Sequence, residues 1–183
     1  QNPYWIAYRN LRLNQKKRYM LSAQLSYDIT DWLNISGRVR VDNTHTKYEQ
    51  KLYASSNLTI TEESTQGHYT ISKPDETQTY ADVLANINKR FNDFSLVANV
   101  GASIVNNRYE DLSYRGPIRE KGIPNVFNVF DLDNTKKKAR QDEWQEQTQS
   151  IFASVEVGWK SMLYLTLTGR NDWASQLLGS SQT

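Results

Sequence analysis

The fold is decided by residues 91–104, which read FNDFSLVANVGASI. After the Asn92-Asp93 pair, every even-numbered position from Phe94 to Ile104 is apolar, and the odd-numbered positions are mostly small or polar. A period of two places one kind of side chain on each face of a β-strand. Asn-Asp is a typical tight-turn pair. The stretch therefore predicts a turn followed by a strand with one apolar face.

The same alternation recurs on both sides of this stretch. It predicts six antiparallel strands at residues 18–28, 35–52, 79–91, 94–108, 145–158 and 163–172. The runs approach the roughly 10 residues that a tilted strand needs to cross an apolar band about 25 Å tall. In each strand the apolar side chains occupy alternate positions, which we call the apolar parity and expect to face lipid. Ten residues represent it: Leu21, Leu25, Val39, Val41, Leu96, Val100, Val155, Val157, Leu165 and Leu167.

The connections between these strands alternate in length. They are short at 29–34, 92–93 and 160–162, and long at about 53–78 and 109–143. Short turns therefore share one edge of the sheet, which is the layout of an outer-membrane barrel with tight periplasmic turns and long extracellular loops. Six aromatic residues lie near the short turns, as an interfacial girdle requires: Tyr27, Trp32, Phe91, Phe94, Trp159 and Tyr164.

Composition excludes several other classes of protein. The 183 residues carry 22 Lys and Arg against 20 Asp and Glu, with no Cys and two His. A net charge this close to zero produces no positive electrostatic field that would attract nucleic acid. The basic run at 136–140 lies among acidic loop residues, which offset its charge. No set of nucleophile, base and metal ligands converges, so we predict no enzyme, no metal site and no cofactor. No apolar window reaches the roughly 18 residues of a transmembrane helix.

Two turn sequences carry a resemblance to a known family. Residues 27–38 (YDITDWLNISGR) and 167–175 (LTGRNDWAS) resemble the periplasmic turn and the strand-end signature of the SusC/RagA family of TonB-linked outer membrane proteins. The opening NPYW at 2–5 and the hairpin FNDFSL at 91–96 fit the same family. The resemblance spans nearly the whole chain and is weakest in the long loops.

The resemblance implies that residues 1–183 are part of a receptor β-barrel domain, a middle section of a barrel of about 22 strands. The family's signal peptide, TonB-interacting segment, plug domain and closing strands are not among these residues. It further implies an importer in the outer membrane of a Gram-negative bacterium, energised by TonB through the N-terminal part. The implied substrates are glycans or peptides, and the implied partner is a SusD-like surface lipoprotein.

Five charged residues lie on the strand parity opposite the apolar one, and we expect them to face the barrel lumen: Arg38, Arg40, Asp42, Arg170 and Asp172. An arginine on the lipid face near the bilayer midplane costs about 2 to 4 kcal/mol, which a wet lumen largely removes. Two interpretations remain open for these residues. They contact solute or plug, or they form a structural ladder of charges.

The long loops carry five aromatic candidates for contact with a partner or substrate: Tyr53, Tyr69, Tyr114, Phe127 and Phe130. Aromatic anchors dominate many interfaces, but the same rings can also pack a loop upon itself. An alternative function, from another class, is a secreted β-rich module that binds carbohydrate. The one-sided distribution of long loops favours the membrane importer.

Overall fold

The computed structural model describes residues 2–177, and strands dominate it. One helix, α1 (Pro3–Arg9), precedes the strands, and two short 3-10 helices are η1 (Val129–Asp131) and η2 (Ser175–Leu177). The seven strands are β1 (Asn10–Thr30), β2 (Leu33–Tyr53), β3 (Gly67–Ser72), β4 (Asp75–Phe91), β5 (Phe94–Pro117), β6 (Lys138–Trp159) and β7 (Leu163–Ala174). The predicted all-β antiparallel class is confirmed.

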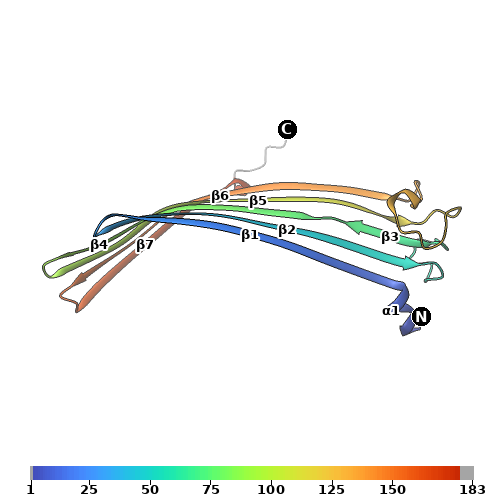
Figure 1. Cartoon of the computed structure of the whole chain (residues 1–183), viewed down its shortest axis with the longest axis horizontal. Coiled ribbons are helices and arrows are strands. Elements are labelled where there is room, and N and C mark those ends of the chain that lie inside the picture. The colour runs from blue at the N-terminus through green and yellow to red at the C-terminus, as the bar shows by residue number, and fades with distance from the viewer. Residues whose placement is uncertain (1, 178–183) are drawn as a thin grey trace. The chain divides into compact units, whose positions relative to one another are not determined.

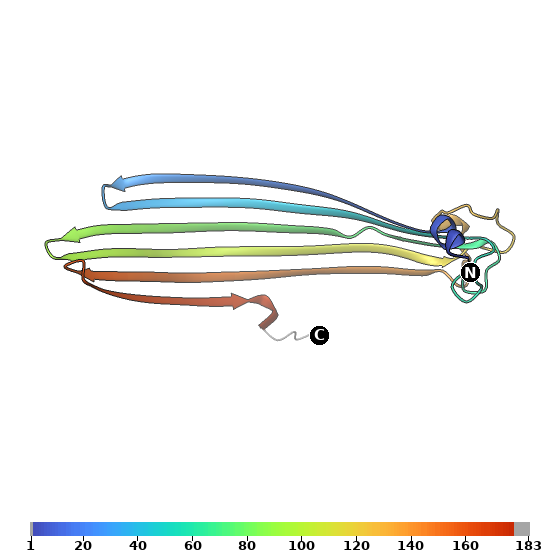
Figure 2. The same cartoon turned by 90° about the horizontal axis from the view of Figure 1, so that it is seen from below.

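The strands pair in the order β1-β2-β3-β5-β6-β7, while β4 pairs with β2 and β5 (Figure 2). Strands β3 and β4 therefore have the same two neighbours and are separated only by Lys73-Pro74. Proline has no N–H to donate to the ladder, so the pairing is interrupted there. The interruption is bridged, because Pro74 O accepts from Thr46 N at 2.9 Å and Lys73 N donates to Leu112 O at 3.3 Å.

The chain divides into two compact units. The first comprises Gln1–Arg18, Thr44–Glu76 and Tyr109–Trp144, and the second comprises Tyr19–Asn43, Thr77–Arg108 and Gln145–Thr183. The first unit contains α1 and the two long loops, whereas the second contains the three tight turns β1–β2, β4–β5 and β6–β7 (Figure 1). In the β4–β5 turn Asn92 has a φ of 47°, the left-handed conformation that asparagine tolerates.

The second unit has one apolar and one polar face. Between β6 and β7, Val155 pairs with Leu167 and Val157 with Leu165, and these pairs alternate with Ser154–Thr168 and Glu156–Thr166. Eight of the ten residues that mark the apolar parity are exposed large hydrophobics: Leu21, Leu25, Val39, Val41, Val100, Val157, Leu165 and Leu167. Leu25 is 82% exposed and Leu167 66%. The apolar face is therefore uncovered.

The first unit has a small core of its own. Leu52, Tyr69, Ile118 and Leu132 are each at most 5% exposed. Ile118 and Leu132 form an isolated bridge that closes the loop between β5 and β6. The long loops are consequently packed structures.

Several predicted boundaries are wrong. The first strand begins at residue 10 instead of 18, the strand predicted at 94–108 extends to 117, and the one at 145–158 begins at 138. The long loops shrink to 54–66 and 118–137, and β3 occupies part of the predicted loop 53–78. The missed segments show only short alternations, such as Leu11 with Leu13 and Tyr69 with Ile71, which are too short to mark a strand. Their backbone groups nevertheless pair with neighbouring strands.

Candidate functional site

The polar face of the second unit places Arg38 and Arg40 around Tyr80. Arg38 Nε donates to Asp82 Oδ2 at 2.8 Å, and its guanidinium lies 5.2 Å from the centre of the Tyr80 ring. Arg40 Nη2 donates to Gln78 Oε1 at 3.3 Å, and its guanidinium lies 5.4 Å from the same ring. Both guanidinium groups are thus held by side chains of β4.

The other predicted arginine on this face, Arg170, bridges β6 and β7. Its Nε donates to both carboxylate oxygens of Asp172 at 2.8 and 3.0 Å, and its Nη2 donates to Ser150 Oγ at 3.1 Å. Asp42, on β2, also interacts with a neighbouring residue. The structure therefore places these residues in two separate groups: Arg38, Arg40 and Asp42 lie on β2, and Arg170 and Asp172 lie on β7. Within these groups Arg38 is paired with Asp82, and Arg170 with Asp172. Contact of these residues with solute or plug stays a prediction.

The aromatic candidates of the first unit divide into packed and exposed rings. Phe127 lies with its ring centre 5.0 Å from that of Tyr53 and 6.1 Å from that of Tyr69. Tyr69 is 3% exposed and belongs to β3, while Tyr114 belongs to β5 and pairs with Ile71. Phe130, in η1, is 91% exposed. Tyr53, Tyr69 and Phe127 thus pack the loops, and Phe130 is the candidate that presents its ring.

Electrostatics reinforce the packed group. Tyr69 donates its hydroxyl hydrogen to Glu49 Oε1 at 2.7 Å, and Glu49 is 8% exposed. Burial and this hydrogen bond raise the pKa of Tyr69. Burial opposes ionisation of Glu49, but hydrogen bonds from Tyr69 and Lys47 and the charge of Lys51 outweigh it and lower its pKa.

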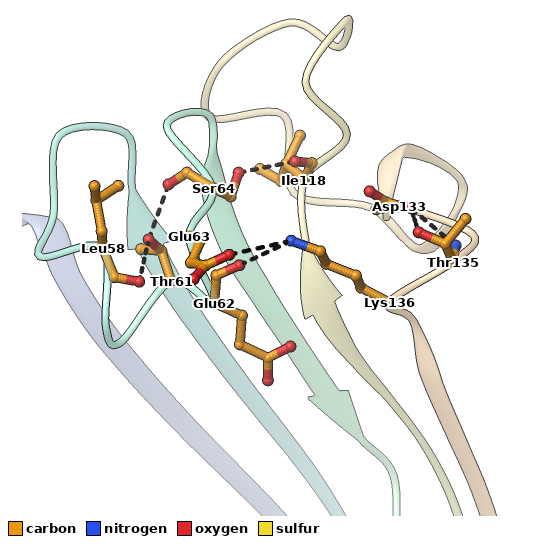
Figure 3. Close-up of polar contacts among 9 residues, drawn as sticks. All are labelled: Leu58, Thr61, Glu62, Glu63, Ser64, Ile118, Asp133, Thr135 and Lys136. Atoms are coloured by element: carbon orange, nitrogen blue, oxygen red, sulfur yellow. Dashed lines mark hydrogen bonds and ion pairs between the residues drawn. The ribbon is translucent and has the colours of Figure 1, made fainter.

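The two long loops are joined by polar contacts (Figure 3). Ser64 Oγ donates to Ile118 O at 2.8 Å, and Thr61 Oγ1 donates to Ser64 O at 2.8 Å. Lys136 Nζ approaches Glu63 Oε2 at 3.9 Å and Glu62 O at 3.5 Å. The Ser64 and Lys136 contacts join loop 54–66 to loop 118–137, whereas the Thr61 contact lies within loop 54–66.

Sequence reasoning missed a cavity in the first unit. Ile60 and Glu62 of loop 54–66 line part of it, together with Arg12, His68 and Arg115. The last three residues come from β1, β3 and β5, and only the strand register brings them together. His68 lay inside a predicted loop, where alternation assigns no face. The sequence feature that could have placed His68 is its position two residues before Thr70, because residues two apart on a strand point to the same face.

Two kinds of feature are absent from the described part of the chain. Residues 2–177 contain no group of three or more His, Cys, Asp or Glu side chains arranged to hold a metal ion. Helix α1 and the other helical turns within the same range are too short and too polar to cross a membrane.

Comparison with known proteins gives a structural likeness only. No protein-family model and no curated protein matches the sequence. Among solved structures, one of the RagAB peptide transporter aligns with a TM-score of 0.76 and 14% identity, covering 94% of this chain and 19% of that chain. The RagAB peptide importer in the 'open-open' state aligns with a TM-score of 0.72 and 15% identity over 94% of this chain and 19% of that chain.

The same importer in the 'closed-closed' state aligns with a TM-score of 0.66 and 13% identity, covering 90% of this chain and 18% of that chain. At these identities the likeness shows the fold: the strands are arranged as in a part of the RagAB transporter. The chain spans about a fifth of the length of the transporter chains that it matches.

Proposed function

We propose that this chain is a section of the β-barrel domain of a SusC-type, TonB-dependent nutrient importer in the outer membrane of a Gram-negative bacterium. The importer takes up glycans or peptides and works with a SusD-like surface lipoprotein. TonB engages it through an N-terminal part outside these residues. The chain acts in transport and performs no covalent chemistry.

One observation carries this proposal, namely the unequal faces of the second unit. Leucines and valines are uncovered on one face, while Arg38, Arg170 and their partners line the other. Water penalises an uncovered apolar face of this extent, and lipid does not. The charged side chains of the other face are costly next to lipid and suit the wet lumen of a barrel.

The likeness to part of a peptide transporter supports the same assignment, as do the sequence motifs of the SusC/RagA family. In this arrangement the tight turns are periplasmic and the joined loops 54–66 and 118–137 are extracellular, where they meet the lipoprotein. The alternative of a secreted carbohydrate-binding module lacks a supporting observation.

Adjacent residues of β7 provide a test with a built-in control. Leu167 lies on the apolar face and Thr168 on the polar face. Nitroxide labels at Leu167→Cys and Thr168→Cys in the intact protein, reconstituted in lipid, report collisions with oxygen or with a water-soluble nickel complex. We expect oxygen to relax the label at 167 and nickel to relax the label at 168. Equal access of nickel to both labels would contradict the membrane assignment.

A further inference from the structure

The apolar parity of the second unit carries a single charged side chain near the tight turns, Lys89. On β4 the last six positions of this parity are Ala81, Val83, Ala85, Ile87, Lys89 and Phe91. In the other strands of the unit the same parity holds no Asp, Glu, Lys or Arg over residues 19–30, 33–43, 94–104, 145–159 and 163–174. Lys89 is therefore an isolated cation on the face that meets lipid in the proposed barrel.

The position of Lys89 along β4 makes this charge tolerable. Lys89 lies three residues before Asn92, at the edge of the sheet that carries the predicted aromatic girdle. A lysine on the lipid face is costly at the bilayer midplane, but the cost falls close to zero near the interface. Polar headgroups lie at that level of a bilayer, so the ammonium group meets headgroups there.

Two aromatic rings hold the ammonium group of Lys89. Its Nζ lies 4.6 Å from the centre of the Trp32 ring and 5.2 Å from that of the Phe91 ring. The β1–β2 turn that carries Trp32 is fixed to β4, because Asn88 N donates to Trp32 O at 2.9 Å. Both rings are exposed and Lys89 is half-buried, so the cluster is accessible to a ligand from outside the sheet.

The charge of Lys89 has no carboxylate partner within residues 2–177, where no carboxylate oxygen lies within 4 Å of its Nζ. An ammonium group has three N–H donors, and aromatic faces accept only weakly. Lys160 in the β6–β7 turn differs: its Nζ lies 5.2 Å from the centre of the Trp159 ring but also 3.7 Å from Asp93 Oδ2. Lys89 is thus left to pair with an external anion.

We propose that Lys89, Trp32 and Phe91 form a binding site for the phosphate of an anionic phospholipid. The phosphodiester accepts hydrogen bonds from the Lys89 ammonium group, and the acyl chains extend along the apolar parity of β4 toward Val83. An anion without chains gains nothing from the exposed apolar side chains around Lys89, whereas an amphiphile matches both the charge and the apolar surface. The site rests on the proposed membrane location of this face, and it specifies the lipid that the tight-turn edge selects.

A site-directed label in bilayers tests this assignment. Bimane at Phe94→Cys, across the tight turn from Phe91, reports the lipid near Lys89 when the intact protein is reconstituted in phosphatidylcholine with a small share of chain-brominated lipid. We expect brominated phosphatidylglycerol to quench with an association constant about fivefold above that of brominated phosphatidylcholine, the effect of one lysine on an anionic lipid. Equal association of the two lipids would overturn the assignment.

Neutral variants separate Lys89 from the other charges of this edge. Lys89→Gln should abolish the preference for phosphatidylglycerol. Lys89→Met, whose unbranched chain keeps the contact with the rings, is a second neutral variant should Lys89→Gln fail to fold. Lys160→Gln is the matched control, because Asp93 already pairs with Lys160, and it should change the preference less than twofold. A preference that persists without the Lys89 charge would also overturn the assignment.

Two further measurements separate this site from a site for soluble anions and from the import function. Glycerophosphoglycerol, the same headgroup without chains, should not displace the brominated lipid, and displacement at equal concentration would overturn the choice of a lipid. A protein that inserts into bilayers but binds the two lipids equally would remove the site and leave the import function standing. A protein that enters bilayers of neither composition would remove both.

Discussion

Tyr69 donates its hydroxyl hydrogen to Glu49 across the β2–β3 pair, at 2.7 Å, and both residues are at least nine-tenths buried. Neither residue pairs directly with the other in the backbone register, since Tyr69 lies opposite Lys51 and Glu49 opposite Ile71. The bond therefore crosses diagonally and links two rows of the sheet. It fixes the ring on which Phe127 packs.

Tyr69→Phe should loosen the first unit. The substitution leaves a buried carboxylate without its strongest donor, which costs about 1 to 3 kcal/mol. Hydrogen exchange of the β3 amides should quicken accordingly. Tyr114→Phe is the matched control, because Tyr114 shares the row of Glu49 and Ile71 but forms no hydrogen bond through its hydroxyl within residues 2–177. Equal protection in the two variants would contradict a structural role for the Tyr69–Glu49 bond.

The first unit should also lose stability in acid through Glu49. Its folded-state pKa lies below the ordinary value of about 4.5, so the unfolded state binds protons first as pH falls. The stabilisation is complete above about pH 4.5 and disappears as pH falls through the lowered pKa. Hydrogen exchange of β3 at a series of pH values, corrected for intrinsic rates, measures it. Glu49→Gln should flatten this dependence, and a profile identical to wild type would exclude Glu49 as its source.

The alternation of the second unit was predictable because its period is strict. Leu165 and Leu167 lie on one face and Thr166 and Thr168 on the other, as the sequence indicates. Here side-chain chemistry changes at every residue, so the sequence alone assigns the faces. The predicted placement of Arg38 and Arg170 on the polar parity follows from the same regularity.

The first unit was not predictable in this way. Tyr69 and Tyr114 lie in strands because their backbones pair with distant segments, although each local alternation holds only two apolar residues. Which residues pair depends on the register between strands that are far apart in the sequence. A local pattern of apolar and polar residues does not predict that register. The cavity around His68 escaped for the same reason, since Arg12 and Arg115 are about a hundred residues apart in the sequence.

Gly101→Ala should destabilise the second unit. A Cβ at Gly101 would lie 2.6 Å from Phe152 Cζ and 2.9 Å from the Val83 carbonyl oxygen, so the sheet must shift. Overpacking of this kind typically costs about 1 to 3 kcal/mol. Urea unfolding in detergent, followed by tryptophan fluorescence, should show an earlier midpoint.

Gly169→Ala is the control for this prediction, because its added methyl group would meet no atom within 4 Å. We expect its free energy of unfolding to remain within about 0.5 kcal/mol of that of the wild type. Phe152→Leu in the Gly101→Ala background should recover part of the loss, since it removes one of the two close contacts. Equal stability of the two alanine variants would show that the ring does not pack over Gly101.

Phe130→Ala should weaken binding of the SusD-like partner without disturbing the fold. Phe130 is 91% exposed, so its removal costs the isolated chain little, whereas an aromatic anchor buried at an interface contributes about 1 kcal/mol or more. Phe127→Ala is the contrasting variant, because its ring packs on Tyr53 and Tyr69 and its loss should open loop 118–137. Co-purification of the lipoprotein measures binding, and proteolysis of the loop measures its order. Retained binding in Phe130→Ala, together with an unchanged loop, would remove Phe130 from the interface and direct the search to Ile123, the other strongly exposed apolar residue of this loop.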